Sequence, residues 1–267
     1  MKILIPIDFS ENAKVALRYA MLLFGDESPE VVLLNTWQVP HTGTGMLVSI
    51  DDLLRDESEK GMAEAVATLR DELHDSIKLS GRVHQGGVID VIKTIMRTED
   101  YDLIVMGTHG ADDVKKKLLG SNTSNVIRGA RIPVLAVPLD TELSTPALVS
   151  LATDFENIKE DQAMILRRIV RKFRTKFHAV NVQREAVTAN GVPDTWQTPF
   201  NGDMPEMVQL VADDVVSGID AYMKDNEVDL LAVIRHDYGF FEGIFHKSVS
   251  RSLSMYTNKP VLVIPEG

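Results

Sequence analysis

The chain has 267 residues, no cysteine and a formal net charge of −11 at pH 7, which allows one large domain or two of ordinary size and excludes a disulfide-stabilised scaffold. The acidic excess excludes a general nucleic-acid binder, because such a protein needs a basic face to displace counterions from phosphates. No apolar run approaches the roughly 18 residues of a membrane span and the first residues lack the length of a signal peptide, so we expect a cytoplasmic protein without membrane contact.

The first part of the chain alternates apolar strands with amphipathic helices. Residues 3–7 predict a buried strand that ends at Asp8. Ser10 is suited to cap a helix, whose apolar face contains Ala13, Leu17, Ala20 and Phe24. Residues 31–36 predict the next strand, and residues 51–79 predict a long helix with Leu54, Met62, Ala65, Leu69 and Leu73 on its apolar face.

The same alternation continues to residue 138. We expect a short strand at 82–85, a helix over 88–97, a strand around Leu103, a helix after Ser121 and a last strand around Val134. Strands and helices that alternate at these spacings predict a doubly wound parallel sheet. Ligands bind such sheets at the carboxyl ends of the strands, near the point where the strand order reverses.

A glycine-containing stretch follows the strand at 101–106. Gly107 and Gly110 let the backbone turn and approach a ligand without a Cβ in the way. Gly120 and Ser121 follow Gly110 after nine intervening residues, and Ser121 is a suitable N-cap for the next helix. Free N–H groups and the positive end of the helix dipole would converge there, which predicts a phosphate site.

Residues 139–146 predict a linker, after which the pattern starts again. The motif 147–155 mirrors 3–9, residues 229–233 echo 102–106, and residues 260–265 repeat 133–138 at the same separation. We therefore expect two copies of one domain, at 1–140 and 146–267.

The second copy lacks most of the glycine pattern. Ile234, Asp237 and Lys247 stand where the first copy has glycine, and only Ser248 matches, so we expect this copy to have lost the phosphate site. Residues 184–206 carry three prolines and two glycines, which predicts an irregular loop in place of the long helix. In this loop Trp196 either covers the exposed sheet or meets a partner.

Three blocks of the first copy carry a family resemblance. The spacing Gly107-x2-Gly110-x9-Gly120-Ser121, the block 5–10 (IPIDFS) and the block 133–138 (PVLAVP) resemble the universal stress protein family, here of a tandem type. The resemblance implies two tandem doubly wound parallel five-stranded sheets, Rossmann-like and similar to the adenine nucleotide alpha hydrolases. It also implies that the chain binds ATP or AMP with Mg²⁺ and acts as a stress-response regulator with slow or no hydrolysis.

Carried onto this sequence, the resemblance implies a set of nucleotide-binding residues. These are Pro6, Ile7, Asp8, Thr36, Met106, Gly107, Gly110, Gly120, Ser121 and Asn122. Asp8 would contact the ribose or orient a cation; alternatively it is an acid favoured by the dipole at a helix start. Lys115–Lys117 is either a solvated face or the source of a lysine that reaches a phosphate.

No catalytic residue can be assigned from the sequence. There is no GxxxxGK[ST] phosphate loop, no evident general base, and His109, His236 and His246 do not form a zinc pattern. An ATP-hydrolysing enzyme and a nucleotide-independent scaffold with an unknown protein partner therefore remain as alternatives.

Both copies keep the last strand. In the resembling family, single-domain members pair through this strand, so we expect the strands at 134–137 and 261–264 to pair antiparallel within one chain. The result would be an internal pseudo-dimer, and further pairing of chains into a homodimer is left open.

Overall fold

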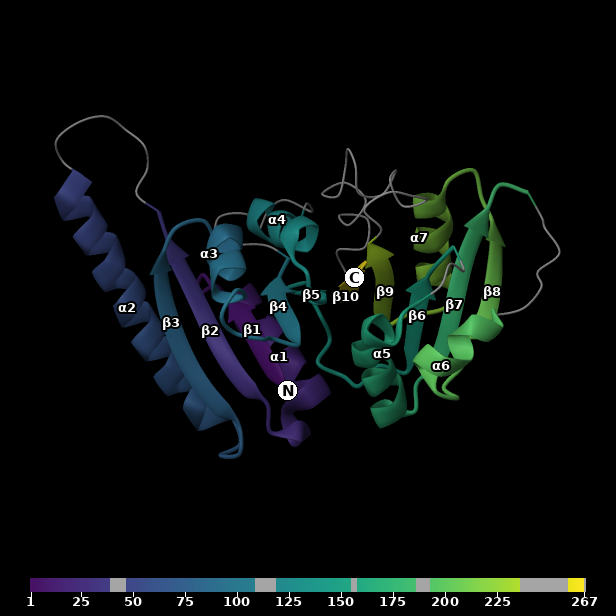
Figure 1. Ribbon diagram of the computed structural model, residues 1–267, viewed down its shortest axis with the longest axis horizontal. Helices are drawn as coiled ribbons and strands as arrows, with labels where there is room; N and C mark the ends of the chain where they lie inside the picture. The colour runs from purple at the N-terminus through teal and green to yellow at the C-terminus, as the bar shows by residue number, and fades with distance from the viewer. Residues whose placement is uncertain (39–46, 109–118, 155–157, 186–192, 236–258, 267) are drawn as a thin grey trace.

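The structure is a computed structural model that describes residues 1–38, 47–108, 119–154, 158–185, 193–235 and 259–266. The described strands form one ten-stranded sheet in the order β3-β2-β1-β4-β5-β10-β9-β6-β7-β8 (Figure 1). The first half contains β1 (Lys2–Pro6), β2 (Glu30–Trp37), β3 (Lys78–Gln85), β4 (Leu103–Gly107) and β5 (Val134–Val137). The second half contains β6 (Leu148–Ala152), β7 (Lys176–Gln183), β8 (Glu206–Val211), β9 (Leu230–Arg235) and β10 (Val261–Pro265). Each half is a parallel five-stranded sheet with the same strand order, as predicted.

Helices cover the sheet in two layers. The helices of the first half are α1 (Glu11–Phe24), η1 (Gly25–Glu27), α2 (Leu47–Glu72), α3 (Val88–Ile95) and α4 (Ser121–Gly129). Those of the second half are α5 (Glu160–Phe173), η2 (Asp194–Trp196), α6 (Gln197–Phe200) and α7 (Val215–Asp225). One core cluster joins the sheet to α1, α2, α5 and α6, and the other joins it to α3, α4 and α7. None of the described helices has both the length and the apolar character needed to cross a membrane.

The two core clusters explain why the strands are continuous apolar runs. Ile3 and Ile5 of β1 belong to one cluster and Leu4 to the other, and all three are fully buried. Because side chains of a strand alternate between the two faces of a sheet, a strand that is covered on both faces needs apolar residues at every position.

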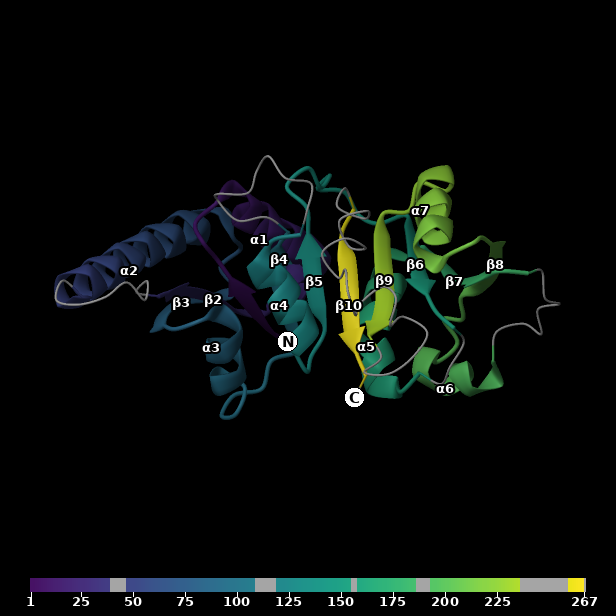
Figure 2. The same cartoon turned by 90° about the horizontal axis from the view of Figure 1, so that it is seen from above.

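The two halves meet through their last strands. β5 and β10 pair antiparallel, with Leu135 opposite Leu262, and Figure 2 shows the two strands side by side with their arrowheads at opposite ends. This confirms the predicted pairing within one chain. Two basic side chains of the second half also reach backbone of the first: Lys172 Nζ donates to the carbonyl of Leu23 at 2.6 Å, and Arg235 Nη2 donates to that of Ala130 at 2.9 Å.

Two predicted helix ends are wrong. The helix expected over 51–79 ends at Glu72, and Leu79 belongs to β3, which is longer than the predicted strand at 82–85. Leu79 is buried in the same core cluster as Leu69, so its apolar character fits either a helix or a strand and could not distinguish them. In the second half, the sequence also predicts a helix over about residues 159–176 as a repeat of the first helix; this helix, α5, ends at Phe173, and Lys176 begins β7.

The segment expected to be an irregular loop, residues 184–206, contains two short helices, η2 and α6, among its described residues. Trp196 and Phe200 are fully buried. Their ring centroids are 5.5 Å apart, and the ring of Phe200 lies 5.3 Å from that of Phe177 on β7. Trp196 therefore covers the sheet, and its complete burial excludes the alternative role of an exposed partner contact.

A charged cluster in the first half links β3 to the start of β1 and to the segment before β4. Arg82 of β3 forms a bidentate ion pair with Glu99, and Lys2 of β1 donates to the same carboxylate at 2.8 Å. Lys2 also lies 4.7 Å above the ring centre of Tyr101. The hydrogen bond from Arg82, aided by that from Lys2, lowers the pKa of Glu99 from its ordinary value of 4.5 to about 2.

This shift predicts a pH-dependent contribution to stability. Because the pKa of Glu99 is lower in the folded than in the unfolded chain, the contribution is present above pH 4.5 and is lost as the pH falls toward about 2. Urea unfolding across this range should therefore show a smaller acid loss of stability for Glu99→Gln than for the unchanged chain. Glu57→Gln, on the exposed side of α2, is the control; equal acid slopes for all three proteins would contradict the prediction.

Candidate functional site

The candidate site lies at the carboxyl ends of β1, β2 and β4. β1 pairs with β2 on one side and with β4 on the other, so the strand order reverses next to it, where ligands bind in sheets of this kind. Six of the described residues that we predicted for the site come from these ends: Pro6 on β1, Ile7 and Asp8 after it, Thr36 on β2, and Met106 and Gly107 on β4. Gly120, Ser121 and Asn122 lie at the start of α4. The topology thus brings them to one edge, while Gly110 lies outside the described residues.

Asp8 sits in a turn that leads into α1. The side chain is exposed and its Oδ1 accepts the N–H of Ser10 at 3.1 Å, while Ser10 Oγ caps α1 by accepting the N–H of Ala13 at 3.3 Å. Phe9 between them has a φ of 62°, a left-handed conformation that costs an aromatic residue free energy and that often marks functional sites. Its ring packs on α2, where a Cβ at Gly61 would lie 2.8 Å from Phe9 Cε2.

Gly107 packs closely against α1. A Cβ at this position would lie 2.6 Å from Asn12 Oδ1 and 3.1 Å from the Asn12 carbonyl carbon. Asn12 is a buried residue of α1 whose Nδ2 donates to the carbonyl of Val137 at 3.0 Å. Close packing between α1 and the end of β4 is therefore by itself a sufficient reason for glycine at this position.

Two hydrogen bonds hold the start of α4 against the end of β4. The N–H of Gly120 donates to the carbonyl of Thr108 at 2.7 Å, and Thr123 Oγ1 donates to the carbonyl of Gly107 at 2.8 Å. Gly120 is the N-cap and Ser121 the first helical residue, so the prediction that Ser121 caps this helix is wrong. The difference matters because Gly120 provides no side-chain cap.

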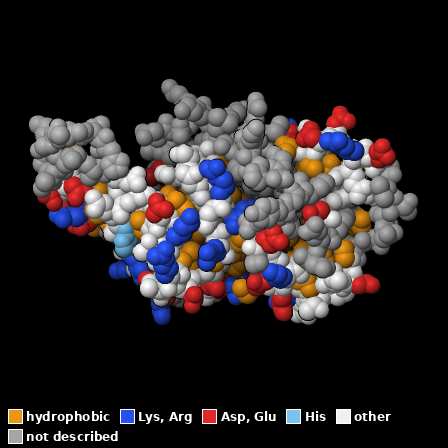
Figure 3. All heavy atoms as spheres, turned by 45° about the horizontal axis from the view of Figure 1, so that its top comes forward, with side chains coloured by type: hydrophobic (Ala, Val, Ile, Leu, Met, Phe, Trp, Pro, Cys, Tyr) orange, Lys and Arg blue, Asp and Glu red, His pale blue; other side chains and the backbone are white. Residues whose placement is uncertain are grey.

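Among the described residues, no side chain caps the amino end of α4, and we call this helix start open. Ser121 and Asn122 are exposed, and the first N–H groups of a helix have no partner within the helix. Figure 3 shows Lys and Arg side chains gathered over the middle of the surface that faces the viewer. Lys93 and Arg128 lie in the last turns of α3 and α4, away from this helix start, so it is the positive end of the helix dipole that favours an anion here.

The sequence did not point to three polar residues that build this edge. Asn12 and Thr123 are buried and make the hydrogen bonds described above. Asn35 of β2 donates from Nδ2 to the carbonyl of Ile7 at 2.8 Å, which fixes the chain just before Asp8. A polar residue in a helix or strand is ordinarily assigned to the solvent side, so nothing in the sequence indicated that Asn12 or Thr123 lies inside. For Asn35, its interruption of the apolar run of β2 was the one available signal.

A metal centre finds no support in the described part of the chain. Within it, no three His, Asp or Glu side chains are placed to hold an ion, and His109, His236 and His246 lie outside it, as do Lys115–Lys117. In the second half, Ile234 replaces the first glycine and is 4% exposed. The other replaced positions, Asp237, Lys247 and Ser248, are not among the described residues.

The tight fit at Gly107 gives a stability prediction. Gly107→Ala should lower the free energy of unfolding by about 1–3 kcal/mol, because the added methyl group must displace Asn12 and the backbone of α1. Chemical denaturation followed by circular dichroism measures this change. Gly25→Ala is the control, since its Cβ would meet Met21 Cβ at an ordinary 3.7 Å and should not destabilise the fold; equal effects of the two substitutions would refute the packing argument.

Comparison with known proteins agrees with this arrangement. The profile of the Universal stress protein family matches residues 1–138. Universal stress protein MJ0577 of Methanocaldococcus jannaschii is 31% identical over 151 residues, covering 51% of this chain and 93% of that protein. Universal stress protein MJ0531 of the same organism is 30% identical over 142 residues, covering 51% of this chain and 81% of that protein.

A solved structure resembles both halves together. A universal stress protein from Archaeoglobus fulgidus matches with a TM-score of 0.71, covering 100% of this chain and 96% of that one at 20% identity. At this identity the likeness shows the fold alone, and it extends over the complete ten-stranded arrangement.

Proposed function

Because the chain belongs to the universal stress protein family, we propose that it is a stress-response regulatory protein that binds ATP or AMP in its first half and hydrolyses it slowly or not at all. The nucleotide would lie at the carboxyl edge of β1, β2 and β4. Residues 1–140 would form the nucleotide-binding domain and residues 146–267 a second, degenerate domain.

The observation that carries this proposal is the open amino end of α4. Its first turn is fixed to the end of β4 by the bonds from Gly120 and Thr123, and no side chain in the described part of the chain caps it. A helix start that is held rigidly and left uncapped presents N–H donors and a positive dipole to a phosphate. Gly120, Ser121 and Asn122 would hold the phosphates, and Met106 and Gly107 would line the same edge.

The remaining contacts follow from the ends of β1 and β2. Pro6, Ile7 and Thr36 would face the adenosine. The exposed carboxylate of Asp8 would contact the ribose or help to hold a Mg²⁺ ion, a cation that prefers oxygen ligands and keeps several waters. The left-handed Phe9 and the bond from Ser10 hold Asp8 in this turn.

Slow turnover is proposed because positioning and charge neutralisation alone give slow phosphoryl transfer. Asp8, the acidic residue at this edge, already has its Oδ1 engaged by the N–H of Ser10. Phosphate release followed over many turnovers distinguishes the regulator from a hydrolysing enzyme.

We expect one nucleotide per chain. The first half has the open helix start, whereas the second half has the buried Ile234 in place of Gly107. Isothermal titration of the full chain with ATP and Mg²⁺ should give a stoichiometry of one. Two equivalent sites would show that the second half binds too, and no binding would favour the nucleotide-independent scaffold.

A proline substitution tests the helix start directly. Proline is well tolerated at the first position of a helix, and Gly120 has φ −58° and ψ 149°, which suits a residue before proline. Ser121→Pro should therefore keep the fold while removing one N–H donor. We expect a roughly ten- to hundredfold loss of ATP affinity, since a hydrogen bond to a charged group contributes about 1.5–3 kcal/mol.

Ser121→Ala is the matched control. It removes the hydroxyl but keeps the backbone N–H, so the difference between the two variants isolates that donor. Unfolding curves should show that Ser121→Pro is as stable as the unchanged chain. Unaltered ATP affinity in a folded Ser121→Pro variant would place the phosphates elsewhere.

A further inference from the structure

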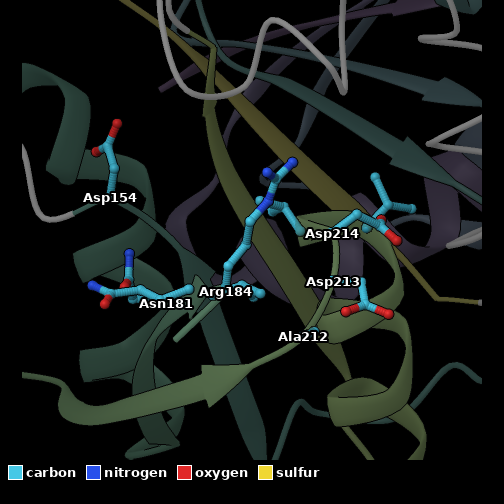
Figure 4. Close-up of a pocket in the computed structure, with 10 residues that line it drawn as sticks. Asp154, Asn181, Arg184, Ala212, Asp213 and Asp214 are labelled. Atoms are coloured by element: carbon cyan, nitrogen blue, oxygen red, sulfur yellow. The ribbon is translucent and has the colours of Figure 1, made fainter. Parts of the chain in front are cut away.

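The second half keeps a cavity at the matching edge of its sheet. The cavity has a volume of about 670 Å³ and opens at the carboxyl ends of β6, β7 and β8. Asp154 follows β6, Arg184 follows β7, and Asp213 and Asp214 follow β8 (Figure 4). Its volume lies within the range of roughly 300–1,000 Å³ that is typical of small-molecule sites.

A buried amide in the wall of this cavity has an unused acceptor. Asn181 of β7 is 3% exposed, and its Nδ2 donates to the carbonyl of Thr153 at 2.8 Å. Its Oδ1 is buried and has no hydrogen-bond partner among the described residues. Because a buried acceptor without a donor costs free energy, a ligand that brings an N–H group would be favoured here.

Asp214 excludes a phosphate from the helix start that borders the cavity. It is the N-cap of α7, and its carboxylate accepts the N–H of Ser217 at 3.0 Å and the hydroxyl of Ser217 at 2.6 Å. These hydrogen bonds lower its pKa, so the carboxylate stays charged at the position that an anion would occupy. In the first half, α3 follows β3 as α7 follows β8, but Gly87 leaves that helix start without a side-chain cap.

One basic and one acidic side chain on the cavity wall are available to pair with a ligand. Arg184 and Asp213 are both exposed, and within the described ranges neither takes part in a side-chain hydrogen bond or ion pair. Figure 4 shows the Arg184 side chain rising between Asp154 on one side and Asp213 and Asp214 on the other. Val182 and Val216 add apolar surface to the same wall.

We propose that this cavity binds a small zwitterion, namely an apolar amino acid or short apolar peptide. Arg184 would pair with the carboxylate, since its planar guanidinium suits bidentate contact with such a group. Asp213 would pair with the ammonium group, and Asn181 would accept one of the N–H donors. This site is separate from the nucleotide site of the first half, and the proposal does not depend on nucleotide binding there.

Matched probes test the charge requirement in the full chain. Leucine and leucyl-leucine should each be titrated by calorimetry and thermal shift, and the tighter of the two identifies the class. For leucine, isoamylamine lacks the carboxylate and 4-methylpentanoate lacks the ammonium group. We expect both single-charge analogues to bind at least roughly tenfold more weakly than the zwitterion.

Exposed substitutions test the assignment of the two charges. Arg184→Gln and Asp213→Asn should each weaken zwitterion binding by roughly tenfold or more, while Glu185→Gln, an exposed neighbour outside the cavity wall, should leave it unchanged. ATP affinity should be the same in all three variants. The proposal is overturned if neither probe binds at millimolar concentration, if a single-charge analogue binds as tightly as the zwitterion, or if both variants bind it normally.

Discussion

The antiparallel contact between β5 and β10 is the constraint on which the rest of this structure depends. Each of these strands would otherwise leave a row of backbone N–H and C=O groups unpaired at the edge of a parallel sheet. Their pairing, centred on Leu135 and Leu262, turns two edges into the middle of one sheet. Arg235 extends the contact by donating to carbonyls at the end of α4, so the helix whose amino end forms the candidate phosphate site is held from behind by the second half.

Much of the fold follows from the sequence because strands covered on both faces cannot be polar. The apolar runs at 3–7, 31–36, 103–106 and 134–137 located four strands of the first half in the correct order. Boundaries were less accurate where one apolar residue satisfied two patterns, as with Leu79 at the start of β3. The short helices around Trp196 were not predicted, because the prolines and glycines of this segment indicate a loop. The aromatic packing of Trp196 with Phe200, and of Phe200 with Phe177, cannot be read from the sequence.

The sequence predicted where the candidate site lies in the sheet, but not which contacts between helices and strands build it. Glycine spacing and strand ends indicated the right edge of the sheet. The glycine spacing did not reveal that Gly107 makes room for Asn12, nor that Gly120 rather than Ser121 occupies the N-cap position of α4. Both features depend on contacts between elements that are distant in sequence. The left-handed backbone of Phe9 has no signature in the residue type, and neither has the packing of its ring against α2 at Gly61.

Because the two halves belong to one chain, their sequences can change independently. In a dimer of identical subunits every substitution appears twice, once on each side of the twofold axis, so a change must suit both sites at once. Here the strand pairing is kept while each half carries its own residues: Gly107 faces Asn12 in one, and Ile234 is buried in the other. The covalent link also fixes the ratio of the halves at one to one and makes their association independent of protein concentration. Two edges with different chemistry can thus be inherited, expressed and regulated as a single unit.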